Sequence, residues 1–156
     1  YSSAASDVYK RQPQEDRSFT LQCTFTPEES TVTVTAPETV KGVTATVSGE
    51  ELTIAYDGAV LSAGSVGRFG PVNALPCLLQ AIGSGYLLEE GRETLEDADC
   101  YRLTLDATAG DTPLKCTVWL DAETLLPRYA EFAADDAVVV SAKLLAFSCA
   151  LQEPEQ

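Results

Sequence analysis

The sequence has no histidine and no methionine, and it has a single tryptophan in 156 residues. Without histidine, the chain lacks the commonest general base and the commonest metal ligand of proteins. Serine and threonine are plentiful, but no G-x-S-x-G motif occurs and no base stands out beside them. These absences argue against an enzyme, and we expect no catalytic residues and no cofactor.

Basic residues are scarce, with 10 Lys plus Arg against 24 Asp plus Glu, which gives a net charge of −14. Such a surface repels nucleic acid and anionic membrane headgroups, so we expect no nucleic-acid partner. The acidic residues recur at predicted turns, such as Glu96-Asp97 and Asp135-Asp136. None has the spacing around a glycine that a calcium loop requires, and we expect no metal site.

A carboxylate group at Glu89, Glu90 and Glu93 is the strongest candidate for acid/base chemistry. Adjacent residues of a strand point to opposite faces of the sheet, which separates these side chains. We therefore interpret the group as the solvated end of a strand.

Long apolar runs are also missing, and none approaches the roughly 18 residues that a membrane-spanning helix needs. The segment Ser6–Gln12 resembles the translation of a transposase adapter used in sequencing libraries, so residues 1–12 are interpreted as an assembly scar. We predict that residues 1–17 are a non-native scar and flexible lead-in, that 18–150 form one domain, and that 151–156 are a flexible tail. A signal peptide or a lipid anchor would precede this fragment.

The cysteines are five in number, without a C-x-x-C spacing. This pattern excludes the usual zinc and redox motifs. We expect most of them to be small buried hydrophobic residues. A disulfide between Cys23 and Cys149, on the first and last predicted strands, is left open.

What the sequence does have is alternation of apolar and polar residues, which predicts half-buried strands. In the first strand Phe19, Leu21, Cys23 and Phe25 share one face. Turn signals such as Asp57-Gly58 separate it from the strands that follow. This first meander is predicted at 19–25, 31–35, 43–47, 52–56 and 59–61.

Helical spacing replaces alternation once, between Pro71 and Ile82. Val72, Leu75, Leu79 and Ile82 recur every three or four residues. We expect Asn73 to cap this helix, Pro76 to lie in its first turn, and Gly83 to end it.

A second meander is predicted at 86–95, 101–105, 114–120, 128–132 and 138–149. In its central hairpin, pairing Leu103 with Leu114 and Tyr101 with Cys116 keeps apolar side chains on one face. Trp119 is then expected on the opposite face, half covered, and Cys100 and Cys116 are expected to point to opposite faces.

Two local patterns accompany this order of elements: Ala55-Tyr56-Asp57-Gly58 at a hairpin, and Trp-x-Asp-x-x-Thr-x-x-Pro from Trp119 to Pro127. Over about residues 18–149 the chain resembles the LolA/LolB-like lipoprotein carrier superfamily, and more closely the small envelope lipoproteins of Gram-positive anaerobes. The resemblance implies a mainly antiparallel β (α+β) fold, a strongly curved incomplete β-barrel with a short apolar helix against its concave face. It also implies an extracytoplasmic protein, at the cell surface or membrane-anchored in a Gram-positive-type envelope, whose relatives carry acyl chains.

Two functions follow from this architecture. The first is a lipoprotein-like module that binds an acyl chain or another apolar ligand in the concave face. The second is a solid-core structural or protein-interaction module, in which the same side chains fill the interior and an envelope protein docks along an edge such as Val138–Val140. The predicted ligand-binding residues are Phe25, Ile54, Tyr56, Leu75, Leu79, Ile82, Leu103 and Val118, with Val34 and Cys116 also lining the face.

Overall fold

The structure is a computed structural model that describes residues 2–11, 16–26, 28–49, 51–65, 71–108 and 113–149. Within these residues the chain forms eleven strands and one helix. They are β1 (Ser2–Arg11), β2 (Asp16–Phe25), β3 (Glu29–Ala36), β4 (Thr44–Ser48), β5 (Glu51–Tyr56), β6 (Ala59–Ser65), α1 (Pro71–Ser84), β7 (Leu87–Leu95), β8 (Ala98–Asp106), β9 (Lys115–Asp121), β10 (Pro127–Ala134) and β11 (Ala137–Cys149).

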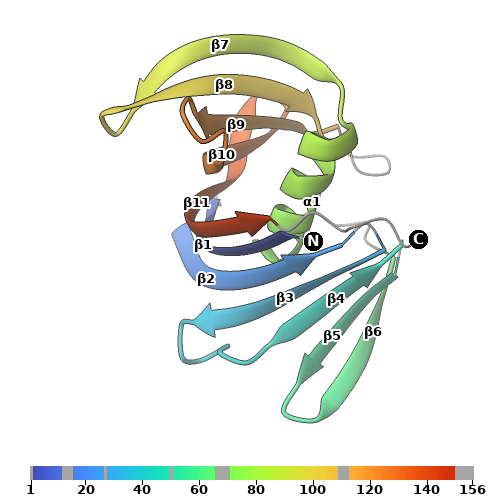
Figure 1. Cartoon of the computed structure of the whole chain (residues 1–156). Helices are drawn as coiled ribbons and strands as arrows, with labels where there is room; N and C mark the ends of the chain where they lie inside the picture. The colour runs from blue at the N-terminus through green and yellow to red at the C-terminus, as the bar shows by residue number, and fades with distance from the viewer. Residues whose placement is uncertain are drawn as a thin grey trace, which may run out of the picture.

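The strands form one antiparallel sheet in the order β6-β5-β4-β3-β2-β1-β11-β10-β9-β8-β7. The sheet bends into two arms, a lower arm that ends at β6 and an upper arm that ends at β7, and α1 lies between them (Figure 1). Because β6 and β7 do not pair with each other, the barrel stays open. The predicted fold class, a strongly curved incomplete barrel with a short helix against its concave face, is confirmed.

Residues 2–11, which the sequence led us to set aside, form an inner strand of this sheet. β1 pairs with β2 on one side, from Ser2 opposite Phe25 to Arg11 opposite Asp16, and with β11 on the other. Backbone partners on both sides stabilise this segment as a strand. The origin of residues 1–12 and the domain limits 18–150 stay predictions, and residues 150–156 lie outside the described ranges.

Three hairpins of the sheet have tight two-residue turns in which both φ angles are positive. These turns are Asp57-Gly58 (49° and 81°), Glu96-Asp97 (48° and 65°) and Asp135-Asp136 (50° and 63°). Positive φ at both central residues defines the type I′ turn, whose twist matches that of paired strands. The turns predicted at all three positions are confirmed.

The register predicted for the central hairpin is wrong. Leu103 lies opposite Val118 rather than Leu114, and Tyr101 lies opposite Leu120 rather than Cys116. β8 runs on to Asp106, and the Ala107 N–H then donates to the Leu114 carbonyl. Since the true register differs from the predicted one by an even number of residues, every side chain keeps its predicted face. Trp119 therefore lies on the face opposite Val118, and Cys100 on the face opposite Cys116, as expected.

The helix is confirmed, although its ends differ from the prediction. It begins at Pro71, so Asn73 is a buried helical residue and not the cap. Pro76 consequently lies beyond the first turn, where its ring nitrogen removes one backbone hydrogen bond. The helix runs past Gly83 to Ser84, and the Gly85 N–H donates to the Ala81 carbonyl. A Cβ at Gly85 would lie 2.5 Å from the Ala81 oxygen, so the close approach there requires glycine.

The core lies between α1 and the concave face of the sheet. Leu75 and Leu78 of the helix are buried, as are Val118 and Phe132 of the upper arm and Leu21 of the centre. These side chains belong to one buried cluster that also includes Cys23, Val32, Val34, Ala74, Leu79, Ala81, Leu105, Ala107, Leu114, Cys116, Ala130, Val140 and Ala142. The helix thus fills the central part of the concave face.

The edge that sequence reasoning proposed for docking lies inside the sheet. β11 pairs with β10 on one side and with β1 on the other, and Val140 is buried. Val140 pairs with Phe132 on one side and with Lys10 on the other, so it offers no open backbone. The edges are β6 and β7.

Candidate functional site

The predicted ligand-binding residues lie on the concave side but divide into three groups. Leu75, Leu79 and Val118 are buried in the core, and Phe25 and Leu103 pack half-buried against it. Val34 and Cys116 belong to the same core. Ile54 and Tyr56 lie apart from this cluster, on β5, and Ile82 is exposed near the end of α1. The structure therefore brings five of the eight predicted residues together, in the filled part of the concave face.

An apolar surface on the lower arm extends the concave face beyond this core. Val32, Ala45, Ile54 and Leu61 are successive cross-strand partners from β3 to β6. Directly opposed residues share a face, and Val32 is in the core, so Ile54 and Leu61 lie on the concave side. Leu52 and Tyr56 share that side because they alternate with Ile54 along β5. We call Leu52, Ile54, Tyr56 and Leu61 the lower-arm strip.

The lower-arm strip becomes more exposed toward the edge of the sheet. Leu52 and Ile54 are half-buried, Tyr56 is 50% exposed and Leu61 is 68% exposed. Sequence reasoning missed Leu61 as a site residue. The two-residue turn at Asp57-Gly58 was the signal that could have found it, because such a turn places Leu61 opposite Ile54.

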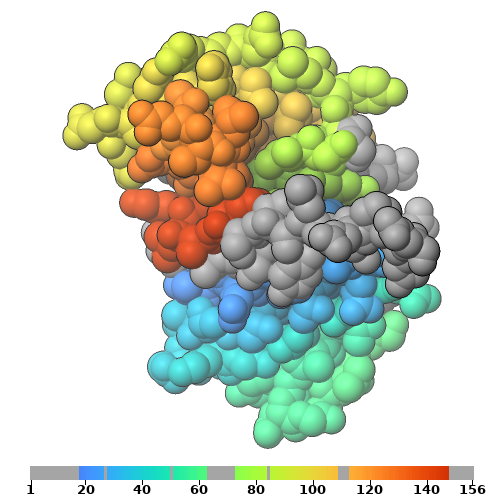
Figure 2. All heavy atoms as spheres, viewed as in Figure 1, coloured from blue at the N-terminus to red at the C-terminus, as the bar shows by residue number. Residues whose placement is uncertain are grey.

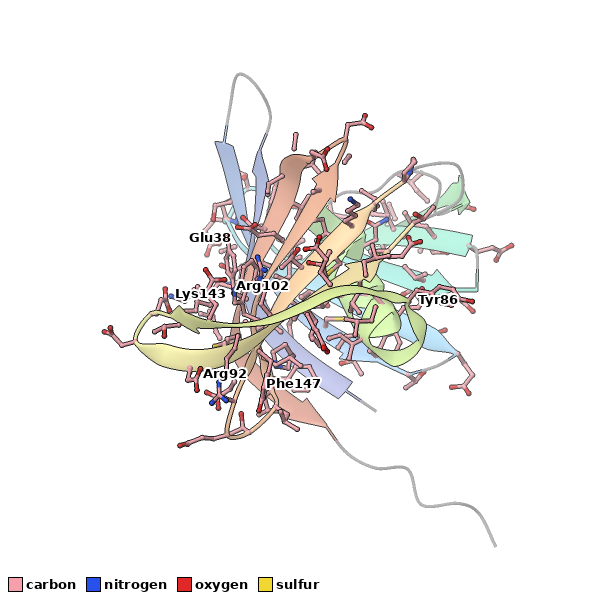
Figure 3. All side chains as sticks on the ribbon, turned by 90° about the horizontal axis from the view of Figure 1, so that it is seen from above. Glu38, Tyr86, Arg92, Arg102, Lys143 and Phe147 are labelled. Atoms are coloured by element: carbon pink, nitrogen blue, oxygen red, sulfur yellow. The ribbon has the colours of Figure 1, made fainter. Side chains whose placement is uncertain are left out.

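A second apolar surface lies where α1 meets the upper arm. Ile82, Tyr86, Leu87 and Leu88 are all exposed, Tyr86 by 80%. Figure 3 shows Tyr86 beside the helix at the start of β7. In Figure 2 the side chains of α1 are visible between the two arms. Leu87 is the cross-strand partner of the core residue Leu105, so the concave side has a filled centre with the lower-arm strip on one flank and exposed Leu87 on the other.

The convex face of the upper arm carries a network of side-chain hydrogen bonds, ion pairs and ring contacts. The indole N–H of Trp119 donates to Glu93 Oε2 at 3.0 Å, and Arg102 Nε lies 4.0 Å from the same oxygen. The Trp119 and Tyr129 rings are 5.3 Å apart between centroids. Glu93, predicted to belong to the solvated end of a strand, is exposed as expected and also accepts the Trp119 hydrogen bond. Trp119 is almost fully buried there, more than the half cover predicted.

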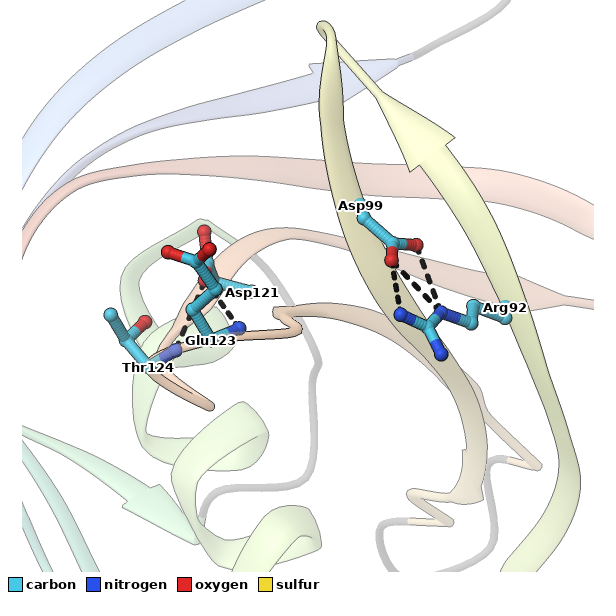
Figure 4. Close-up of polar contacts among 5 residues, drawn as sticks. All are labelled: Arg92, Asp99, Asp121, Glu123 and Thr124. Atoms are coloured by element: carbon cyan, nitrogen blue, oxygen red, sulfur yellow. Dashed lines mark hydrogen bonds and ion pairs between the residues drawn. The ribbon is translucent and has the colours of Figure 1, made fainter.

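Asp121 organises the turn between β9 and β10 (Figure 4). Its Oδ1 accepts hydrogen bonds from the backbone N–H groups of Glu123 and Thr124, and its Oδ2 accepts one from Arg128 at 2.9 Å. The two backbone bonds, followed by Arg128, hold the pKa of Asp121 below its usual range. The Trp-x-Asp-x-x-Thr-x-x-Pro pattern therefore has a structural role here.

On β7 and β8, Arg92 forms an ion pair with Asp99 (Figure 4). Arg92 also lies over the Tyr101 ring, 5.4 Å from its centroid. Arg92 is the cross-strand partner of Tyr101, whose alternation with Leu103 and Leu105 places both on the concave side. The bond to Arg92 lowers the pKa of Asp99. This pair gives the tip of the upper arm a polar concave surface, unlike the lower-arm strip.

The cysteines are unpaired in the part of the chain whose side chains are described, with Cys23, Cys100 and Cys116 buried and Cys77 half-buried. Cys23 is free, and β1 separates its strand from β11, so the suggested Cys23–Cys149 disulfide is wrong. Burial raises the pKa of Cys23 and Cys116 to about 12 and that of Cys77 to about 11. Among the described residues, no three His, Cys, Asp or Glu side chains gather as metal ligands.

No described helix is long and apolar enough to cross a membrane.

No protein family profile and no curated protein sequence matches the chain. Solved structures share its fold. A DUF1329 family protein from Desulfovibrio piger superposes with a TM-score of 0.54 at 13% identity, over 94% of this chain and 84% of that one. A LolA superfamily protein from Nitrosomonas europaea gives 0.50 at 13% identity, over 97% and 86% of the two chains. A putative outer membrane lipoprotein-sorting protein domain from Vibrio parahaemolyticus gives 0.50 at 13%, over 97% and 87%.

The chain thus shares the fold of a LolA superfamily protein, which confirms the predicted resemblance at the level of fold.

Proposed function

We propose that this protein is an extracytoplasmic, lipoprotein-like binding module that holds an acyl chain, or a ligand of similar apolar character, against its concave face. The lower-arm strip carries the proposal, because it exposes Tyr56 and Leu61 next to the buried core. Burial of an apolar chain contributes on the order of 0.8 kcal/mol per methylene. A short stretch of acyl chain along the strip therefore supplies enough free energy for measurable binding.

The predicted ligand-binding residues have different roles in this proposal. Ile54 and Tyr56 contact the ligand together with Leu52 and Leu61. Leu75, Leu79 and Val118, with Phe25 and Leu103 packed against them, form the filled core from which the strip extends. Ile82, on the other flank of α1, contacts a ligand long enough to pass the helix. No catalytic group or cofactor takes part.

A cellular location accompanies this proposal. We place the protein at the cell surface, or anchored to the membrane, in an envelope of Gram-positive type. The resemblance of the Trp119–Pro127 segment to small envelope lipoproteins supports this location. The likeness to a putative outer membrane lipoprotein-sorting protein domain supports an envelope location in general.

The test is titration of the delipidated protein with a fluorescent fatty acid. We expect saturable binding, and a loss of about tenfold in affinity for Leu61→Ser, since full burial of a leucine is worth about 1.5–3 kcal/mol and each 1.4 kcal/mol is about tenfold. Leu145→Ser is the matched control, because Leu145 is likewise an exposed leucine, at 56%, but lies on β11. No uptake by the parent protein, or an equal loss in both variants, would contradict the proposal.

One observation favours the alternative, a solid-core structural or protein-interaction module. α1 buries Leu75 and Leu78 completely against the sheet, so the centre of the concave face is already filled. This second function is favoured if the parent protein takes up no fatty acid and Leu61→Ser leaves the stability of the protein unaltered.

A further inference from the structure

The two edge strands of the sheet differ in charge. β7 carries Glu89, Glu90, Arg92 and Glu93, whereas β6, with the sequence AVLSAGS, carries no charged residue. Edge strands of natural sheets are commonly protected by charged side chains, because their open N–H and C=O groups otherwise pair with another strand. β7 has this protection and β6 lacks it.

β6 also exposes apolar side chains on both faces of the sheet. Leu61 is 68% exposed on the concave side, and its neighbour Val60, which points to the convex side, is 67% exposed. Figure 1 shows β6 as the last strand of the lower arm. Open backbone groups combined with apolar cover on both faces are the features that favour addition of a further strand.

We infer that β6 pairs antiparallel with β6 of a second copy of this chain, about a two-fold axis. An uncharged strand is complementary to itself, so no like charges oppose each other in the new ladder. In a pairing centred on Leu61, Asp57 of one copy falls opposite Ser65 of the other, because the two residues are equally far from Leu61. Pairing of β6 with β7 of another copy would place the β7 carboxylates inside a sheet and would build an open chain of subunits.

The strength of this contact follows from its size and from the net charge. A strand of seven residues extends about 23 Å, and one such edge buries less than the standard interface of about 1,600 Å². Each copy also carries −14, and this long-range repulsion is screened within about 8 Å at physiological salt. The dimer is therefore weak, depends on concentration and strengthens with salt.

Pairing of this kind has a consequence for the concave face. Leu61 is both the outermost residue of the lower-arm strip and the centre of the new ladder. The strips of the two copies then meet along the joined edge and form one longer apolar surface. Dimerisation covers the open backbone edge of β6 whether or not a ligand binds.

Sedimentation velocity tests the inference on the whole chain, from about 5 to about 500 µM, at about 20 and about 300 mM NaCl. We expect the weight-average sedimentation coefficient to rise with concentration, and to rise further at high salt. Val60→Lys puts a charge into the new inner ladder and is expected to keep the protein monomeric. Leu145→Lys, at a similarly exposed position on β11, is expected to associate like the parent.

A parent protein that stays monomeric throughout, a Val60→Lys variant that associates normally, or a Leu145→Lys variant that loses association would each overturn the inference. Ser62→Lys provides a second edge variant if Val60→Lys fails to fold. Because Val60 and Ser62 lie outside the lower-arm strip, both variants are expected to bind fatty acid like the parent monomer. Failure of dimerisation is thus distinguished from failure of the proposed function.

Discussion

Trp119 on β9 donates its indole N–H to Glu93 on β7, across the intervening strand β8, at 3.0 Å. Arg102 of β8 lies beside the same carboxylate. Since β7 is an edge strand that exposes most of its side chains, this bond connects it directly to β9, in addition to its backbone ladder with β8.

Replacement of Glu93 by alanine should destabilise the protein by about 1 kcal/mol, because it leaves a nearly buried indole N–H without its acceptor. Urea unfolding followed by tryptophan fluorescence measures this directly, since Trp119 is the single tryptophan. Glu90→Ala, on the opposite face of the same strand, is the control and should cost less than about 0.5 kcal/mol. Equal effects of the two changes would contradict the assigned role of Glu93.

The glycines at the end of α1 give a pair of opposite predictions. Gly83→Ala should stabilise the protein by about 0.5 kcal/mol, because a Cβ there meets no atom within 4 Å and alanine favours the helix. Gly85→Ala should destabilise it by about 1–3 kcal/mol, since its Cβ would collide with the Ala81 carbonyl. Chemical denaturation of both variants checks the signs. A stabilised Gly85→Ala protein would contradict the close approach of Gly85 to the Ala81 carbonyl at the end of α1.

The sequence predicted the architecture well where periodicity is local. Alternation located most strands, and the helical spacing of Leu75 and Leu79 located α1. Face assignments survived even in the central hairpin, because a register error of an even number of residues preserves the side on which Trp119 lies. The acidic turns were predictable from turn chemistry alone.

Properties that depend on distant partners were not predictable in this way. The neighbours of β11 are set by the pairing of β1 between the ends of the chain, so Val138–Val140 was mistaken for an edge. Asn73 was mistaken for a cap because the pattern did not show that the helix begins at Pro71. Which concave residues would be covered depended on where α1 docks, and therefore Leu79 and Ile82, one turn apart, differ in exposure.

The depressed pKa of Asp121 predicts a loss of stability in acid. The folded value lies below the ordinary 3.8, so the carboxylate stabilises the fold above that pH, and the contribution disappears as the pH falls toward the folded value. Asp121→Asn should therefore lower the Tm at neutral pH, and its deficit should narrow below about pH 4. Thermal unfolding of both proteins across this range tests the assignment. A constant deficit at every pH would contradict it.

Buried thiols should resist alkylation in the folded protein. At pH 8 a thiol of pKa about 12 is ionised in about one molecule in 10⁴, against about one in ten at the ordinary value of 9.0. Cys23 and Cys116 should therefore react at least about a thousandfold more slowly than in guanidinium, as followed by site-resolved mass spectrometry. Rapid labelling of either residue in the native protein would show that the core opens.

Methyl NMR of the protein with added dodecanoic acid tests the central claim most directly. We predict saturable shifts in the methyl resonances of Leu52, Ile54 and Leu61. The methyl resonances of Leu78 and Val140, which are fully buried, should not shift. Absence of any shift, or shifts confined to residues of the convex face such as Val60, would contradict binding at the lower-arm strip.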